Sequence, residues 1–452
     1  MLRHLAYNTG RFDLGNMVQA VWATAHGHPL RVTDLRGDQI SRLGAHVDPL
    51  LVVFAPLWWL WPSADLLLVA QAIAVAAGAL PVCWLARKHL GSDRAAVGFS
   101  LAYLLFPATQ WLTLNEFHPV ALACPLLLFA FWFLDDDRPA PFATCALAAA
   151  LAKEEIPLVV AGFGIWYAIT RQRWREGGAI AAAGIAAAAV AVGVVIPHFN
   201  HGQSSSFYAR YGELGGSPGG VARTAVTHPW RVLTAAFDHR GAHYLLELAL
   251  PLACLCLLAP LVLVALIPDL ALNLLSATTA QTSIHFHYTA GEIPPLVAAT
   301  VLGAARIGRQ RPDLARPIGT IVVCAALAGN YVLGPLPVWR LFPGGATAES
   351  HAADVTRHDR IADRALRLIP GGAVVSASNT LGAHLSARRR VLSFPFVQDA
   401  AWVAVDETQP AYADRLAPLP LATQVVWLRR NPAWRLVFER DGILVFRRVL
   451  PP

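Results

Sequence analysis

The sequence predicts an α-helical polytopic membrane protein of about ten spans, with a small α/β domain outside the membrane. Of its 452 residues, 56% are hydrophobic and 14% are charged, whereas soluble proteins carry about 25% charged residues. The mean hydropathy is +0.47, and many apolar runs approach the roughly 20 residues that cross a bilayer core. This composition excludes an ordinary globular enzyme and a disordered protein.

Residues 1–64 are expected to form an external segment with interfacial helices. Residues 12–22 predict a helix with polar side chains along one side. Residues 50–61 are too short to span and are anchored by tryptophans, namely Trp58, Trp59 and Trp61. Because no span precedes this external segment, we expect a chain that starts late or lacks a first signal-anchor helix.

Residues 65–335 are expected to hold the membrane spans. The predicted spans are 65–86, 94–114, 119–134, 140–152, 155–170, 178–197, 244–258, 259–275, 291–306 and 317–335. Short basic loops at 87–94, 171–175 and 306–316 belong in the cytoplasm by the positive-inside rule. By parity, the loop 198–243 and the tail lie outside. The basic residues of these short loops serve as orientation signals, so the net charge of +7 does not predict nucleic acid as a partner.

The tail, residues 336–452, changes to a charged, soluble composition that predicts a small extracytoplasmic α/β domain. In chain order the pattern predicts a strand at 372–378, a helix at 379–387, and strands at 390–394 and 401–406. Residues 434–448 alternate on both sides of Asp441-Gly442, which predicts a hairpin.

Five polar clusters gather on the external side by the same parity. Their members include Asp13, Asn16 and Gln19; His46 and Asp48; Glu116 and His118; Lys153, Glu154 and Glu155; and His285, His287 and Tyr288. Charged groups at membrane depth are costly and are therefore functional candidates. A bland alternative stays open for two clusters: a wet helix face at Asn16 and Gln19, and an internal salt bridge of Lys153.

The same residue types admit a divalent cation. Its candidate ligands are Asp13, His46, Asp48, Glu116, His118, His285 and His287. None has the spacing of a local zinc motif, so a polar external loop is the alternative. Asp269 is expected either to pair with Asn273 one helical turn on or to face a cavity.

In order and spacing, these motifs resemble the DUF2079 family of membrane proteins, which are similar to the GT-C superfamily of membrane glycosyltransferases. The resemblance rests on residues 12–22, 46–49, 116–119, 153–155 and 287–288, and on Ser376, Leu381, His384, Leu385 and Arg389 in the tail. It covers nearly the whole chain. Two departures are Val18, where the family often has an acidic residue, and the eleven residues before Phe12, where a first transmembrane helix would normally precede.

This resemblance implies a catalytic carboxylate at Asp13 and a polyprenyl-phosphate-linked sugar as donor. A carboxylate there can accept a proton from an acceptor hydroxyl while cations neutralise the departing phosphate. The implied substrate- and phosphate-binding residues are Lys153, Arg11, Arg210, Gln19, Glu154, Glu155 and Tyr288. His46, His118 and His287 would line the cavity. The expected partners are membrane lipid, the lipid-linked donor, and a glycan or lipid acceptor of the cell envelope.

A membrane transporter or lipid flippase without catalytic activity is the alternative, because it would use the same polar cavity without a base. An inactive scaffold is a weaker third reading. A transporter predicts internal repeats and polar residues that continue to the cytoplasmic ends of the spans. The sequence has no clear repeat and its polar clusters stay on one side, which favours an inverting glycosyltransferase at the external face of the cell membrane.

Overall fold

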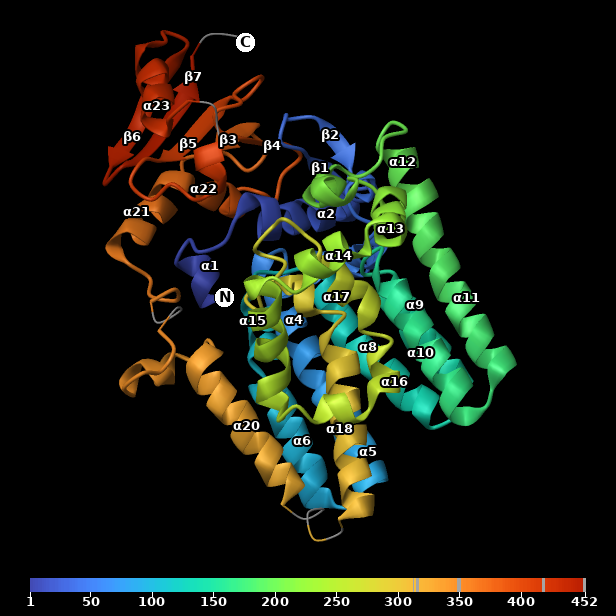
Figure 1. Ribbon diagram of the computed structural model, residues 1–452. Helices are drawn as coiled ribbons and strands as arrows, with labels where there is room; N and C mark the ends of the chain where they lie inside the picture. Colours follow the sequence, from blue (N-terminus) through green and yellow to red (C-terminus); the bar gives the residue numbers. More distant parts are fainter. Residues whose placement is uncertain (312, 314–316, 348–350, 417–418, 450–452) are drawn as a thin grey trace.

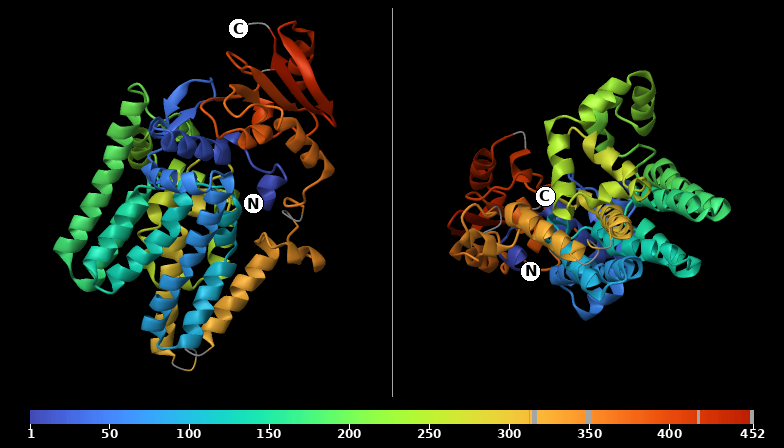
Figure 2. Two further views of the ribbon diagram at one scale, coloured as in Figure 1. Left: turned by 180° about the vertical axis from the view of Figure 1, so that it is seen from behind. Right: turned by 60° about the horizontal axis from the view of Figure 1, so that its bottom comes forward.

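The computed structural model describes residues 1–311, 313, 317–347, 351–416 and 419–449. A bundle of helices forms the larger part, and a sheet domain lies beyond one end of it (Figure 1). The N-terminal segment lies between the two, under the sheet domain and across the end of the bundle. Figure 2 shows the same arrangement from behind.

The N-terminal segment begins with short helices and a two-stranded ribbon. Its elements are α1 (Leu2–Leu5), η1 (Arg11–Gly15), α2 (Asn16–Ala25), β1 (Arg31–Thr33), β2 (Gln39–Ser41), η2 (Arg42–Gly44), η3 (Pro49–Val53) and α3 (Phe54–Leu60). The predicted helix over 12–22 therefore starts as the π-helical turn η1. Gln19 on α2 is 2% exposed, so it does not belong to a wet face.

The predicted interfacial helix is only partly right. Residues 49–60 form η3 and α3, and Trp59 and Trp61 are 71% and 41% exposed. Trp58 is 3% exposed and packs with Leu14 and Leu67 in the interior. It is a core residue and not an interfacial anchor, because it lies on the face of α3 that covers α2 and α4.

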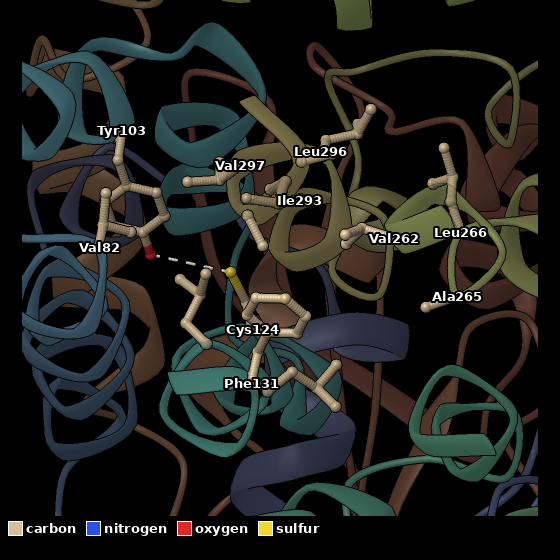
Figure 3. Packing of buried hydrophobic residues seen from close by; sticks show 14 of the residues in the cluster. Val82, Tyr103, Cys124, Phe131, Val262, Ala265, Leu266, Ile293, Leu296 and Val297 are labelled. Carbon is tan, nitrogen blue, oxygen red and sulfur yellow. Dashed lines mark hydrogen bonds between the residues drawn. The ribbon is translucent and has the colours of Figure 1, made fainter. Parts of the chain in front are cut away.

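The bundle follows the predicted spans closely in its first half. Its helices there are α4 (Ala64–Ala77), α5 (Ala79–Leu90), α6 (Asp93–Leu105), α7 (Pro107–Leu114), α8 (Pro119–Asp135), α9 (Pro139–Ala150), α10 (Ile156–Arg171), α11 (Trp174–Val190), η4 (Ala191–Val195) and α12 (Ile196–Phe199). Figure 3 shows part of the core between them, where Tyr103 donates a hydrogen bond to the Val75 carbonyl at 2.7 Å and its hydroxyl lies 3.8 Å from the Cys124 Sγ.

The second half contains shorter elements. They are η5 (Ser206–Leu214), α13 (Pro218–Thr227), α14 (Pro229–Ala236), α15 (His239–Ala249), η6 (Leu250–Leu252), η7 (Leu255–Leu258), α16 (Pro260–Leu263), α17 (Ile267–Leu274), η8 (His287–Thr289), α18 (Ile293–Gln310), α20 (Ile318–Leu333) and η9 (Pro337–Leu341). The spans predicted at 244–258 and 259–275 are not continuous helices. Pro251 and the left-handed residues Ala253 and Cys254, with φ of 52° and 55°, interrupt the helical path, and hydropathy does not detect such a break.

Among the described residues, two continuous helices are long and apolar enough to cross a membrane, Ala64–Leu90 and Trp174–Phe199. The pair α6 and α7 is a third candidate, bent by 49°. The bend falls at Phe106, whose ψ of 121° is the extended conformation that a following proline imposes. The predicted count of about ten spans is not established by these helices.

The sheet domain holds a five-stranded mixed sheet in the order β4-β3-β5-β7-β6. Its elements are α21 (Arg357–Leu366), β3 (Val375–Ala377), α22 (Asn379–His384), β4 (Val391–Ser393), β5 (Trp402–Asp406), η10 (Ala413–Leu416), α23 (Leu421–Arg430), β6 (Trp434–Arg440) and β7 (Ile443–Arg448). β3 pairs in parallel with β4 and β5. The predicted hairpin is confirmed, with Asp441 and Gly442 both at positive φ.

Candidate functional site

Asp13 lies on η1, at the end of the bundle that faces the sheet domain. The turn is closed by a bond from Gly15 N to Gly10 O at 3.0 Å, and the Asp13 side chain is 54% exposed. Glu116, from the loop between α7 and α8, accepts hydrogen bonds from Gly10 N at 3.0 Å and Leu14 N at 2.8 Å. Its carboxylate thereby satisfies backbone donors that the start of a helix leaves unpaired.

Two stacked histidines lie beside Asp13. His118 Nε2 is 3.4 Å from Asp13 Oδ1, and His118 Nδ1 donates to the Asn115 carbonyl at 2.9 Å. The His118 ring stacks on His287 with centroids 3.7 Å apart and an interplanar angle of 18°. Because a carbonyl only accepts, Nδ1 carries a proton, and Nε2 meets the Asp13 carboxylate as a donor when the imidazole is protonated.

Cationic groups continue this cluster around Tyr288. The ring of His287 lies 4.3 Å from that of Tyr288. Lys153 Nζ lies 5.6 Å from the Tyr288 ring and forms an ion pair with Glu155 at 2.5 Å. Arg210 Nη1 donates to the Tyr288 hydroxyl at 3.4 Å. Tyr288 thus lies near two positive charges, and that of Lys153 is paired with Glu155.

His46 joins the cluster through Glu154. His46 Nδ1 is 2.9 Å from Glu154 Oε1, and Val47 N donates to Glu154 Oε2 at 3.0 Å. The His46 ring stacks on the Phe207 ring with centroids 4.6 Å apart. The Arg210 guanidinium lies over the same Phe207 ring, 4.6 Å from its centroid. Residues from all five sequence clusters therefore form one chain of contacts, although they are far apart in the sequence.

A cavity of about 300 Å³ adjoins Arg210. Its charged lining includes Arg210, Arg231, Arg240 and Asp238. Arg240 pairs with Asp238 at 2.8 Å, and Arg231 donates to the Glu213 carbonyl at 3.0 Å. Within the described residues, the hydrogen bonds of the Arg210 side chain are long, at 3.4 and 3.5 Å, so its guanidinium can turn toward an anion in the cavity.

The pKa values of the two carboxyl groups near η1, Asp13 and Glu116, are shifted in opposite directions. The protein atoms packed around the Asp13 carboxylate oppose its ionisation, although the side chain is 54% exposed. The hydrogen bond and charge of His118, together with Arg42, nevertheless hold its pKa below the ordinary value. Burial and the charge of Asp13 raise the pKa of Glu116 to about 8. Asp13 is therefore the ionised group and Glu116 holds the proton at neutral pH, a division of roles common at acid-base sites.

Two residues that the sequence predicts to bind substrate or phosphate, Arg11 and Gln19, stabilise the fold instead. Arg11 is 2% exposed and donates to Val391 O, Ser393 Oγ and Thr33 O. Because these hydrogen bonds occupy its guanidinium, Arg11 is not placed to bind phosphate. Gln19 is likewise committed, to Thr33 and to the carbonyls of residues 388 and 389.

Two further candidates lie outside the chain of contacts. Asp48 is buried in an ion pair with Arg42 at 2.6 Å. His285 packs on Trp111 and bonds to Ser283. In the part of the chain that the structure describes, no group of three or more His, Cys, Asp or Glu side chains is arranged to hold a metal ion, so the candidate cation ligands do not converge.

Asp269 does not pair with Asn273 as the sequence suggested. Asn273 Nδ2 donates to Glu292 Oε1 at 2.8 Å, and Tyr244 donates to Glu292 Oε2 at 2.5 Å. Asp269 instead lies against Gly291, where an added Cβ would meet Asp269 Oδ2 at 2.1 Å. The partner of Asn273 is Glu292, which immediately precedes α18, and the i, i+4 spacing within one helix does not reveal it.

Three contributors to the site escaped the sequence reasoning. Gln71 holds the loop before α8, since its Nε2 donates to the carbonyls of residues 112, 113 and 116 and its Oε1 accepts from His118 N at 2.9 Å. Asn115 accepts from His287 N at 3.2 Å. The Phe207 ring stacks on the His46 ring. Only Gln71 had a usable signal, an amide inside an otherwise apolar run.

The raised pKa of Glu116 predicts a loss of stability at alkaline pH. The folded protein holds this proton to about pH 8, whereas an unfolded glutamate has a pKa of about 4.3. This contribution to stability is complete below the unfolded pKa and is lost as pH rises through the folded pKa. We expect the melting temperature in detergent to fall more steeply between about pH 6 and 9 in the wild type than in Glu116→Gln. Equal slopes would contradict the assignment.

Comparison with known proteins agrees with this architecture. A family model described as "Predicted membrane protein (DUF2079)" matches residues 3–445. The crystal structure of ArnT from Cupriavidus metallidurans in the apo state is similar, with a TM-score of 0.50 and 14% sequence identity over 96% of this chain and 93% of that chain. No curated protein matches in sequence.

The likeness to ArnT concerns the fold alone. It agrees with the predicted fold class of a helical membrane protein, and the structure itself shows the small C-terminal sheet domain. The family match covers almost every residue, including all the polar clusters described above. The chain therefore belongs to the DUF2079 family of predicted membrane proteins.

Proposed function

We propose that this protein is a GT-C-like glycosyltransferase that moves a sugar from a polyprenyl-phosphate donor to a cell-envelope acceptor at the external face of the membrane. The observation that carries the proposal is the exposed, ionised Asp13 beside His118, which ring contacts through His287 and Tyr288 connect to Arg210 on the wall of a cavity. The fold shared with ArnT is consistent with this proposal.

In the proposed reaction, Asp13 accepts the proton of an acceptor hydroxyl. The hydroxyl oxygen forms a bond to the anomeric carbon, the bond from that carbon to the phosphate oxygen breaks, and the lipid phosphate leaves with the electron pair. Attack opposite the leaving group inverts the anomeric centre. A positioned base of this kind contributes about 10²- to 10⁴-fold to the rate.

Arg210 is the better candidate for the phosphate than Lys153. Lys153 has a close ion pair with Glu155, the internal salt bridge that the sequence offered as an alternative role for this lysine. Arg210 combines long hydrogen bonds with a position on the cavity wall, and a guanidinium suits phosphate oxygens in geometry. The developing negative charge of the leaving group would therefore meet Arg210.

We also propose that the sheet domain is extracytoplasmic. The α5–α6 and α10–α11 loops lie at the end of the bundle opposite the sheet domain (Figures 1 and 2). Those loops are basic, and the positive-inside rule assigns such loops to the cytoplasm. The Asp13 end and the sheet domain would then share the external side, where a lipid-linked sugar and an envelope acceptor can meet.

The test is transfer of radiolabelled sugar from a panel of polyprenyl-phosphate sugars to lipid or glycan acceptors, with the purified chain in membranes. Asp38→Asn is the matched control for Asp13→Asn, since Asp38 is an exposed carboxylate in the turn between β1 and β2. Transfer by the wild type and this control is the expected result. No transfer from any donor, with movement of lipid or solute across vesicles instead, would support the transporter or flippase reading.

A further inference from the structure

An amide side chain of the sheet domain binds the backbone of the turn that carries Asp13. Asn379, the first residue of α22, accepts hydrogen bonds on its Oδ1 from Arg11 N at 3.0 Å and Phe12 N at 3.4 Å. Glu116 binds Gly10 N and Leu14 N of the same turn. The backbone donors around Asp13 are thus divided between the bundle, through Glu116, and the sheet domain, through Asn379.

Asn379 is itself fixed inside the sheet domain. Its backbone N donates to Asp414 Oδ1 at 2.7 Å, and the other oxygen of Asp414 accepts from Ala411 N at 2.9 Å. Asp414 is 7% exposed. Asn379 also follows Ser378 at the end of β3, so its position is tied to a strand inside the sheet.

The segment around η1 packs closely against α22 and the residues that follow it. A Cβ at Gly10 would lie 2.7 Å from Asn379 Nδ2, and one at Gly15 would lie 2.6 Å from Ser386 Oγ. Arg11 extends the contact to β4 through Val391 O at 2.7 Å. A displacement of α22 would therefore displace η1, and the Asp13 carboxylate with it.

We propose that Asn379 is a positioning residue for Asp13, so that the sheet domain sets the place of the candidate base. Its catalytic consequence rests on the proposed glycosyltransferase activity, whereas the coupling of the two parts does not. A base displaced by about 1 Å loses on the order of 100-fold in rate without loss of substrate binding. The sheet domain thereby becomes part of the catalytic unit.

The experiment compares Asn379→Ala, Asn379→Asp and Asn431→Ala in the full chain. Aspartate keeps an oxygen acceptor for Arg11 N and Phe12 N, whereas alanine removes it. Asn431 is the matched control, since its Oδ1 also accepts a backbone N–H, from Ala433 at 3.0 Å, but within its own loop. Hydrogen exchange of the amides of residues 10–15 reports the contact without reference to activity, and exchange of β7 reports folding of the sheet domain.

We expect Asn379→Ala to speed exchange at residues 11 and 12 by about fivefold or more, with β7 unchanged. Its kcat should fall by about 10- to 100-fold at a nearly constant KM. Asn379→Asp should stay within a few-fold of wild type in both, and Asn431→Ala should change neither.

Unchanged exchange at residues 11 and 12 in Asn379→Ala would overturn the contact. Faster exchange with full activity would overturn the positioning role. If the wild type transfers no sugar but Asn379→Ala still speeds exchange at η1, the proposed function fails and the coupling between the sheet domain and the Asp13 turn stands. Rescue by aspartate separates loss of the acceptor from general disorder.

Discussion

Replacing Asp13 with asparagine is expected to lower sugar transfer by about 10²- to 10⁴-fold, because an amide cannot accept the proton of the acceptor hydroxyl. Asparagine has the same shape, and the Asp13 side chain makes one long contact, to His118 at 3.4 Å. Folding should therefore be preserved. The measurement is kcat and KM for the best donor found, on purified wild type, Asp13→Asn and the control Asp38→Asn.

The kinetic pattern distinguishes a base from a binding group. Loss of a base lowers kcat and leaves KM close to wild type, whereas loss of a binding contact raises KM. Asp13→Asn with wild-type kcat would exclude Asp13 as the base and direct attention to the remaining carboxylates of the cluster. Thermal melting of each variant in the same detergent controls for folding.

Asp48→Ala is expected to lower the free energy of unfolding by about 3–5 kcal/mol, the largest stability effect that a single side chain in this region offers. The Asp48 carboxylate accepts hydrogen bonds from Arg42 Nη2 at 2.6 Å and from Arg42 Nε at 2.7 Å. The two side chains are 2% and 6% exposed. Removing the carboxylate leaves a buried guanidinium without its counter-charge.

The double variant Arg42→Met with Asp48→Leu is the control, since apolar residues of similar volume often replace a buried pair with little loss. It should recover most of the stability that Asp48→Ala loses. Unfolding in detergent, followed by circular dichroism, measures both. A loss below about 1 kcal/mol in Asp48→Ala would mean that solvent reaches the pair as it does at a surface salt bridge.

The polar clusters illustrate how far the sequence reaches. Span parity places Asp13, Glu116, Lys153 and His287 on one side of the membrane, and the structure brings these residues into one chain of contacts. Parity says nothing of side-chain direction. Arg11 and Asp13 are two residues apart, yet one is buried against β4 and the other is exposed, because the turn η1 separates their directions.

The mixed outcome for Trp58, Trp59 and Trp61 has a similar cause. Tryptophan suits both a membrane interface and a protein interior, and composition does not distinguish the two. Only the packing of α3 against α2 decides that Trp58 is buried. Likewise, the segment 244–275 has the hydropathy of two spans, but its prolines and left-handed residues break the path into short helices.

The sequence by itself determined the helical membrane class, the change of composition at the tail, and the hairpin at Asp441-Gly442. These features follow from local rules of hydropathy, charge and turn conformation. Only the tertiary structure decided that the sheet domain touches the Asp13 turn through Asn379. The two residues that meet there are separated by more than three hundred positions, and a contact of that kind depends on how whole elements pack, which local patterns do not encode.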